Sequence, residues 1–364
     1  MIERINEYNP DYAIHPGEIL DETLEARGIS SAEMAKRIGL TEKTLSEIIN
    51  GKAPVTPDTA VRLESILGIK ADVWNNLESN YQLFKVRQKQ QEEFKKNIDW
   101  ARSFPLKELR KYGIVSDTRN QIIIVKELLS FFGVSSIHSW NELYESPAVQ
   151  FRRSSAYKID EKSVSTWLRF SELLAHEMQT KNFNKRSFER ALSEIRSLTL
   201  EGSDQFSDRL TVLCAEAGVA LVFLSEFPKT RISGATRWLS SRKAMISLTL
   251  RYKTDDQFWF SFYHEAGHIL KHGKQRVFID GEDHSEDTLE READNFARDI
   301  LIPPGKYEKF VSRGKLYKDD IQSFANEIGI APGIVVGRLQ HDGYIKYNLH
   351  NDLKRRIRLT VTND

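Results

Sequence analysis

The chain has 364 residues, of which 40% are hydrophobic, and this length and composition suit two or three globular domains with cores of their own. The single cysteine, Cys214, excludes an internal disulfide and a zinc cage of four thiolates, so any zinc site must use histidines and carboxylates. The first residues carry acids and a proline where a signal peptide needs an apolar core, and no apolar run approaches the roughly 18 residues of a membrane span. We therefore expect a cytoplasmic protein with no membrane partner.

The net charge of +1 is unevenly distributed along the chain. Residues 1–84 contain 8 Lys and Arg against 14 Asp and Glu, a net charge of −6, whereas residues 85–111 contain 9 against 4, a net charge of +5. The basic stretch could contact nucleic acid or an acidic neighbouring domain. A solvated connecting helix is the simpler interpretation, because charge runs usually form exposed faces.

Residues 16–81 have the pattern of short helices separated by turns. The helical segments are "GEILDETLEARG", "SSAEMAKRIG", "TEKTLSEIING", "TPDTAVRLESILG" and "ADVWNNLESNYQLF". Ser30 and Glu33 have the spacing of a capping box at the start of the second segment, and several segments end at a glycine, as helix C-caps do. We expect an all-α domain over residues 1–84.

The second and third of these helices, joined by a turn at Gly39, have the arrangement of a helix-turn-helix. The later helix, Thr41 to Asn50, would enter the major groove of DNA. The residues that we expect to contact DNA are Lys36, Arg37, Thr41, Lys43, Thr44, Ser46 and Lys52. The residues that we expect in the core are Met34, Ala35, Ile38, Leu45, Ile48 and Ile49.

The run from "HPGEIL" through "AVRLESILGIKADVWNNLESNYQLF" resembles HigA-type antitoxins over about residues 12–84. The resemblance implies a transcriptional repressor of a toxin-antitoxin system that forms a homodimer, binds operator DNA and pairs with a toxin. The net charge of −6 opposes DNA binding because phosphate contacts need Lys and Arg. A local cluster of basic residues partly answers this objection, and its members are Lys36, Arg37, Lys43, Lys52 and Arg62. A helix-turn-helix that binds only proteins stays open as an alternative.

Residues 85–205 continue the helical pattern, as in "IIIVKELLSFFG", "EKSVSTWLRFSELLAHEM" and "KRSFERALSEIRSLT", but contain no constellation that indicates chemistry. The runs "GVALVFL", "GATRWLS" and "AMISLTL" then predict a small β-sheet that precedes another helix. We interpret "AMISLTL" as a candidate sheet edge on which an extended substrate could pair. Near the C-terminus, "YKDDIQSFANEIGIAPGIVVGRLQHDGYI" has a rhythm of helix, glycine and helix.

The sequence "HEAGH" at residues 264–268 lies in a helix predicted for about residues 256–273. At 3.6 residues per turn, His264 and His268 lie about 40° apart around the helix and about 6 Å apart along it, so both imidazoles can reach one tetrahedral ion. Glu265 is displaced by about 100° from His264 and can act on water rather than as a ligand. This is the geometry of the zincin helix.

A catalytic zinc needs a third protein ligand and leaves its fourth position to water. The segment "EDTLEREADNFARDILIPP" predicts a second amphipathic helix, in which Glu290 and Asp294 share one stripe. Glu290 could complete the ligand set, while Asp294 accepts a hydrogen bond from the far nitrogen of a ligand histidine. The weaker candidates are Glu292, on another face, and two histidines that we interpret as solvent-facing or helix-end residues, His272 and His284.

The segment from about residue 210 to residue 345 resembles the ImmA/IrrE family of metallopeptidases. The resemblance is carried by "YHEAGHILKHG", "EREADNFARDILIPP" and "FANEIGIAPGIVVGRLQ". By this resemblance one zinc ion per chain is bound through His264, His268 and Glu290, Glu265 is the catalytic residue, and the substrates are helix-turn-helix repressors. Zinc in such a site lowers the pKa of water toward about 7, so that Glu265 can take a proton during attack on a peptide carbonyl.

These patterns together predict a mostly helical α+β chain. We expect a helix-turn-helix domain over residues 1–84, a helical middle region over 85–205, and a small-sheet, zincin-like metallopeptidase domain with a C-terminal helical segment over 206–364. The expected function is that of a transcription regulator or antitoxin whose zinc endopeptidase cleaves a partner repressor, a toxin or the chain's own linker between about residues 85 and 115. The alternative is a noncatalytic antitoxin or repressor with a structural metal site. Three ligands plus a base favour catalysis, because structural zinc usually has four protein ligands.

Overall fold

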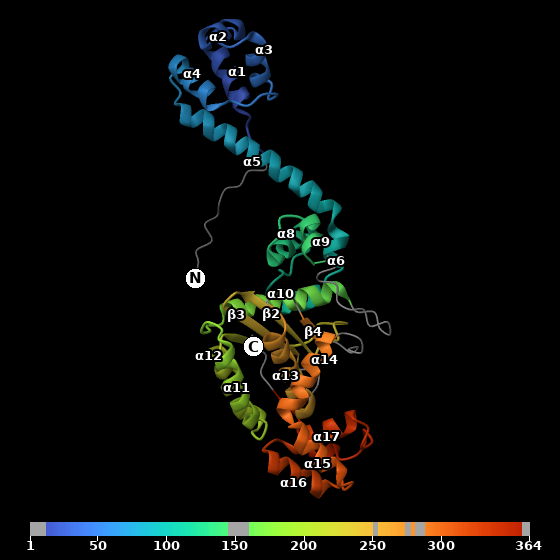
Figure 1. Ribbon diagram of the computed structural model, residues 1–364. Helices are drawn as coiled ribbons and strands as arrows, with labels where there is room; N and C mark the ends of the chain where they lie inside the picture. Colours follow the sequence, from blue (N-terminus) through green and yellow to red (C-terminus); the bar gives the residue numbers. More distant parts are fainter. Residues whose placement is uncertain (1–11, 145–159, 250–253, 274–277, 281–287, 359–364) are drawn as a thin grey trace. The chain divides into compact units, whose positions relative to one another are not determined.

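The computed structural model (Figure 1) describes residues 12–144, 160–249, 254–273, 278–280 and 288–358. The chain divides into two compact units, Met1–Ile98 and Asp99–Asp364, and each has a hydrophobic core of its own. The domain boundaries expected at residues 84 and 205 remain predictions. Residue 84 lies within α5 (Ala71–Lys96), and residue 205 lies within α12 (Ser203–Glu216).

The described part of the first unit is helical, which confirms the expected all-α domain. Its helices are α1 (Pro16–Ala26), α2 (Ser31–Ile38), α3 (Glu42–Ile49), α4 (Pro57–Leu67) and α5. The Ser30 side chain accepts a hydrogen bond from the Glu33 amide, and Gly39 ends α2 in the left-handed conformation with φ 68°. The predicted core residues Met34, Ala35, Ile38, Leu45 and Ile48 are buried, and Ile49 is partly buried against them.

The segment from His15 to Gly17 fixes where α1 begins. The His15 Nδ1 atom accepts a hydrogen bond from the Gly17 amide at 2.8 Å, so an imidazole fills the N-cap role that Ser, Thr, Asp and Asn usually fill. A Cβ atom at Gly17 would lie 2.3 Å from the carbonyl oxygen of Ile48 and 2.5 Å from that of Ile49. Glycine is therefore needed for α1 to approach the end of α3, the helix that carries the predicted DNA contacts Lys43, Thr44 and Ser46.

The second unit places a series of helices before its sheet, as the helical pattern of the middle region predicts. These helices are α6 (Ile98–Arg102), α7 (Leu106–Lys111), α8 (Gln121–Phe132), α9 (Ile137–Tyr144), α10 (Glu161–Glu177), α11 (Lys185–Leu198) and α12. Aromatic packing holds the first of them together: the ring of Trp140 lies 5.4 Å from that of Phe104 and 5.7 Å from those of Trp100 and Phe132.

The sheet of the second unit has the strand order β1-β3-β2-β4, which confirms the small sheet expected here. Its strands are β1 (Val219–Leu224), β2 (Gly234–Ser240), β3 (Lys243–Thr249) and β4 (Phe278–Asp280). β3 pairs in parallel with β1 and antiparallel with β2, so the prediction that "AMISLTL" forms a sheet edge is wrong. Its nearly continuous apolar run reflects a strand with both faces covered.

The helix α13 (Asp255–Lys271) corresponds to the helix predicted for residues 256–273 and is buried over most of its length. It contacts β2 and β3 of the sheet and two of the helices that follow it, α14 and α17 (Figure 1). The elements that follow are α14 (Thr288–Leu301), α15 (Pro304–Ser312), α16 (Lys318–Ile328), α17 (Pro332–His341) and a short 3₁₀ helix, Asn351–Leu353.

Two buried aspartates begin α13. Asp255 pairs with Arg355, whose Nε atom lies 3.2 Å from Asp255 Oδ2, and Asp256 pairs with Lys354 at 2.7 Å. Burial raises the pKa of Asp255, and hydrogen bonds from Arg355 oppose that rise. Two glycines of α17 make room for these carboxylates. A Cβ atom at Gly333 would lie 2.4 Å from Asp255 Oδ1, and one at Gly337 would lie 2.6 Å from Asp256 Oδ2. The C-terminal segment and α17 therefore hold the start of α13 in place.

Among the described residues, no single helix has the length and apolar character of a membrane span. The helices α8 and α9 meet these criteria of length and composition only as a pair, with a bend of 40° between them.

Replacing Arg355 by alanine should lower the free energy of unfolding by about 3 kcal/mol at about pH 8, because the buried Asp255 carboxylate then lacks its cation. The loss should be smaller at about pH 5. A carboxyl group whose pKa is raised by folding binds its proton more tightly in the folded chain, so stability is lost as the pH rises through the folded pKa.

Urea unfolding at the two pH values measures both effects. The exposed neighbour Arg356 provides the matched control. Its backbone forms a β-bridge with Thr254, the residue before α13, and an alanine at this position keeps that backbone contact. A loss for Arg355→Ala no larger than that for Arg356→Ala would contradict this role of Arg355.

Candidate metal centre and nucleic-acid interface

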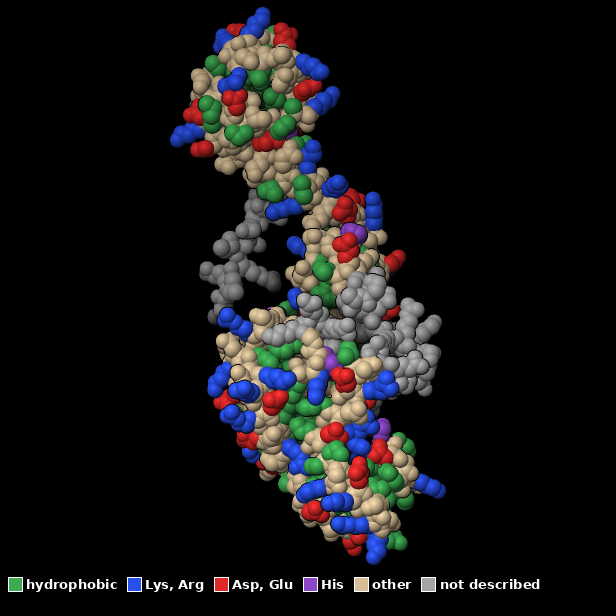
Figure 2. All heavy atoms as spheres, in the orientation of Figure 1, with side chains coloured by type: hydrophobic (Ala, Val, Ile, Leu, Met, Phe, Trp, Pro, Cys, Tyr) green, Lys and Arg blue, Asp and Glu red, His purple; other side chains and the backbone are tan. Residues whose placement is uncertain are grey.

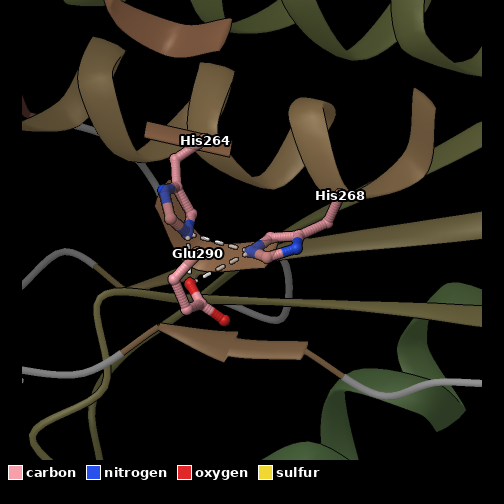
Figure 3. A group of neighbouring side chains, drawn as sticks. All are labelled: His264, His268 and Glu290. Carbon is pink, nitrogen blue, oxygen red and sulfur yellow. Dashed lines mark hydrogen bonds and ion pairs between the residues drawn. The ribbon is translucent and has the colours of Figure 1, made fainter. Parts of the chain in front are cut away.

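The predicted ligands His264, His268 and Glu290 converge at one point, where α13 faces α14 (Figure 3). The two Nε2 atoms lie 3.0 Å apart, and Glu290 Oε2 lies 3.1 Å from His264 Nε2 and 3.3 Å from His268 Nε2. Both histidines are buried and Glu290 is half-buried. A Cβ atom at Gly267 would lie 3.2 Å from the Cα atom of Ala293, so the small residue of "HEAGH" is what lets the two helices approach.

The donor set fits a zinc ion. His264 Nδ1 lies 2.8 Å from Asp294 Oδ1, and because an ionised carboxylate only accepts hydrogen bonds, this nitrogen carries the proton. The lone pair of His264 Nε2 is therefore left to face Glu290 and His268. Acceptor atoms at such distances repel one another unless they share a proton or a cation. Tetrahedral zinc with nitrogen and oxygen ligands places its ligand atoms about 3.3 Å apart, close to the separations found here.

The electrostatics of the site favour the protonation states that a metal ion requires. Burial lowers the pKa of His268, although its contact with Glu290 opposes this shift. Burial acts to raise the pKa of Glu290, but its contacts with His264 and His268 outweigh burial and hold that pKa well below its usual range. A neutral imidazole and an ionised carboxylate are the ligand forms that zinc binds.

The predicted base, Glu265, is fully buried and is not part of this three-residue group. The Thr236 hydroxyl on β2 lies 2.5 Å from Glu265 Oε2 and 3.1 Å from the Glu265 carbonyl oxygen. A Cβ atom at Gly234 would lie 2.7 Å from Glu265 Oε1. The start of β2 therefore fixes the position of this carboxylate, one residue along the chain from a predicted ligand.

The sequence interpretation missed the position of His272. This residue follows the end of α13, as expected for a helix-end histidine, but it is buried rather than solvent-facing. Its Nδ1 atom lies 2.9 Å from His268 Nδ1, and its Nε2 atom lies 3.3 Å from Glu292 Oε2. The signal was present in the sequence, since the three histidines recur every four residues along one helical face. His284 lies outside the described residues.

A cavity of 570 Å³ lies beside the candidate metal ligands, between α13, α14 and α17. Asp294, which contacts His264, is part of its wall, and so is Phe260, whose ring centroid lies 6.2 Å from that of His264. Apolar and charged side chains both contribute to the lining. The volume is in the range of pockets that hold small ligands or side chains.

The residues predicted to contact DNA lie on α2, on α3 and in the turns before and after α3. Those that are exposed are Lys36, Arg37, Thr41, Lys43, Ser46 and Lys52, whereas Thr44 is half-buried. The Thr41 hydroxyl caps α3 by accepting the Thr44 amide at 3.1 Å. Acidic and basic side chains alternate over the visible face of the first unit in Figure 2.

Two of the basic groups near the predicted interface are engaged within the unit. Arg37 pairs with Glu33 one turn earlier on α2. Arg62 donates to the Ile38 carbonyl oxygen at 2.9 Å and pairs with Asp58 at 2.8 Å. Arg62 therefore stabilises the end of α2, and its membership of the basic cluster stays a prediction.

Comparison with known proteins finds a match within each unit. Residues 20–74 match the helix-turn-helix family, and virulence-associated protein I of Dichelobacter nodosus is 38% identical over 80 residues, which are 22% of this chain and 74% of that protein. Antitoxin HigA-1 of Vibrio cholerae serotype O1 is 36% identical over 80 residues, which are 22% of this chain and 75% of that protein. The chain belongs to the HigA-type helix-turn-helix family.

Among solved structures, the Pseudomonas aeruginosa antitoxin HigA with the higBA promoter is 36% identical. The match covers 21% of this chain and 83% of that one, with a TM-score of 0.20. Residues 214–340 match the IrrE N-terminal-like domain of a peptidase family. This HigA-type chain therefore carries a peptidase-like second unit, and the matched range contains the three converging residues and Glu265.

The purified chain should bind about one zinc ion per molecule, because three buried donor atoms converge within tetrahedral reach. Elemental analysis after gel filtration measures the content. The double variant His264→Ala, His268→Ala should lose the ion, whereas His341→Ala, which removes an exposed histidine of α17, should keep it. Full zinc content in the double variant would rule out this ligand set.

Proposed function

We propose that this HigA-type protein is a DNA-binding regulator whose second unit is a zinc-dependent endopeptidase. The observation that supports the peptidase most strongly is the group of His264, His268 and Glu290 with the buried Glu265 beside it on the same helix. Three ligands and an adjacent base are the composition of catalytic zinc sites, whereas structural sites are usually closed by four protein ligands.

In this proposal zinc would act as a Lewis acid toward the scissile carbonyl and toward water. His264, His268 and Glu290 would hold the ion, and Asp294 keeps the proton of His264 on Nδ1. Glu265 takes a proton from the attacking water at a carboxylate oxygen and delivers it to the nitrogen of the leaving amine. The Thr236 hydroxyl holds this carboxylate in one orientation throughout.

The protein substrate that we propose is a partner repressor of the helix-turn-helix class or a toxin. Cleavage of the chain's own linker between residues 85 and 115 is restricted by helices, because α5 extends to Lys96 and α6 and α7 follow. Peptidases bind extended chain, so a cut within a helix requires that helix to unfold first. The non-helical positions in that range lie at Asn97, around Phe104 and from Tyr112 onward.

The first unit is proposed to bind an operator as a homodimer, with α3 in the major groove. The relation to HigA antitoxins and the exposed Lys36, Lys43 and Lys52 support this assignment. Acidic residues on the same helices, Glu33 and Glu47, lie near basic side chains and reduce their effect on phosphate. Binding is therefore expected to rest on few phosphate contacts.

Residues 1–98 contain the whole first unit and should bind a palindromic site near the protein's own promoter. With few phosphate contacts, the logarithm of affinity should fall with the logarithm of salt at a slope of about −0.9 per contact. Mobility-shift titrations at several salt concentrations measure that slope, and Lys43→Ala should reduce it by about one. The control variant Lys70→Ala, on the loop before α5, should not. Binding without sequence preference, or none, would favour a helix-turn-helix that binds only proteins.

Glu265→Gln should strongly reduce proteolysis while the fold and zinc content survive, because glutamine keeps the size of the side chain and removes its basicity. Cleavage of the partner should fall at least about a hundredfold, as expected for loss of a general base. Mass spectrometry of the chain incubated with candidate repressors and toxins, wild type beside variant, measures this. DNA binding by the first unit should be unchanged. Undiminished cleavage by Glu265→Gln would contradict the mechanism, and a structural metal site predicts no difference.

A further inference from the structure

We propose that His272 and Glu292 form a hydrogen-bonded relay that positions His268 as a metal ligand. The proposal rests on the metal site described above and adds two residues to it. His264 has a carboxylate, Asp294, directly on its far nitrogen. His268 has a second imidazole in the same place, and the carboxylate of Glu292 lies one ring further out.

The geometry of the relay follows from the helix. Residues 264 and 268 lie one turn apart on α13, and His272, directly after the helix ends, brings its ring against that of His268. The ring centroids of His268 and His272 lie 5.0 Å apart, and the Nδ1 to Nδ1 distance is 2.9 Å. His272 is buried, so the contact is shielded from water. An imidazole pair held at this distance needs a proton between the two nitrogens.

When His268 binds a metal ion through Nε2, the contacts with His272 and Glu292 determine where the remaining protons lie. For His268 to offer the Nε2 lone pair to a metal ion, its proton must be on Nδ1, which donates to His272 Nδ1. His272 must then carry its own proton on Nε2, where Glu292 Oε2 accepts it at 3.3 Å. The identity of the residue at 272 therefore determines which nitrogen of His268 is available to the metal.

The relay should act on orientation more than on charge. Glu292 is 53% exposed, so water screens its charge, and two rings separate it from the metal position. His272 touches the ligand itself and should have the larger effect. His272 is thus a positioning residue, and Glu292 holds it in the required tautomer.

The test is the affinity of the full chain for Zn²⁺, measured by competition with a chromophoric chelator. His272→Leu removes the acceptor and should weaken zinc binding about 10- to 100-fold. His272→Asn places an amide oxygen near the position of Nδ1, which can accept the same hydrogen bond, and should restore affinity to within a few-fold of wild type. Asp299→Ala, which changes an exposed carboxylate on α14, is the control and should have no effect.

A double-variant cycle tests the relay as a unit. Glu292→Ala should weaken binding several-fold in the wild-type background and have no effect in the His272→Leu background, because the relay is already broken there. Circular dichroism and thermal unfolding of each metal-free variant show whether the fold is retained.

The outcomes separate the relay from the site on which it rests. If the wild type binds zinc and His272→Leu binds it equally well, the relay is wrong and the metal site stands. Additive losses in the double variant, or failure of His272→Asn to restore affinity in a folded chain, would also overturn the relay. A wild-type chain that binds no zinc would refute the proposed metal site itself.

Discussion

The close approach of α13 to α14 at Gly267 and Ala293 is the constraint on which the candidate site depends. The two histidines and Glu290 come from different helices, so their convergence requires a fixed separation of these helices. With a Cβ atom at Gly267 only 3.2 Å from Ala293 Cα, any larger side chain would push the helices apart. Glycine weakens a helix by roughly 1 kcal/mol relative to alanine, and packing against α14 offsets that cost.

The same helix is held by polar contacts from parts of the chain that are distant in sequence. Arg355 binds Asp255 at the start of α13 and also donates to the carbonyl oxygens of Leu200 and Glu201, after α11. At the opposite end, His272 contacts Glu292 of α14. Because α13 is fixed at both ends and along its buried faces, the side chains between are presented on a rigid element, as precise metal sites require.

The parts of this arrangement that follow from local geometry could be predicted from the sequence. Spacing within a helix determines which side chains share a face, and this suffices to pair His264 with His268 and Glu290 with Asp294. The helix-turn-helix could be located for the same reason, since caps and apolar periodicity are local signals.

The parts that depend on tertiary contacts could not be predicted. The burial of His272 depends on α14, and the engagement of Arg62 depends on the end of α2. The internal position of β3 depends on a parallel pairing with β1 across more than twenty residues of chain. Apolar runs of that kind are compatible with an edge or a central strand, and only the neighbouring strands decide between them.

Charge balance explains why the two histidines are supported differently. Glu290 and Asp294 lie close to the point where the histidines meet, and the buried Glu265 lies next to His264 in the chain. A further carboxylate placed directly on His268 would add negative charge to a buried site that already contains three carboxylates, at a considerable cost in desolvation. A neutral imidazole, His272, provides a hydrogen-bond partner for His268 without adding charge. The carboxylate that contacts His272 belongs to Glu292, whose side chain is exposed. The buried Glu265 can then remain the carboxylate of the site that is available as a base.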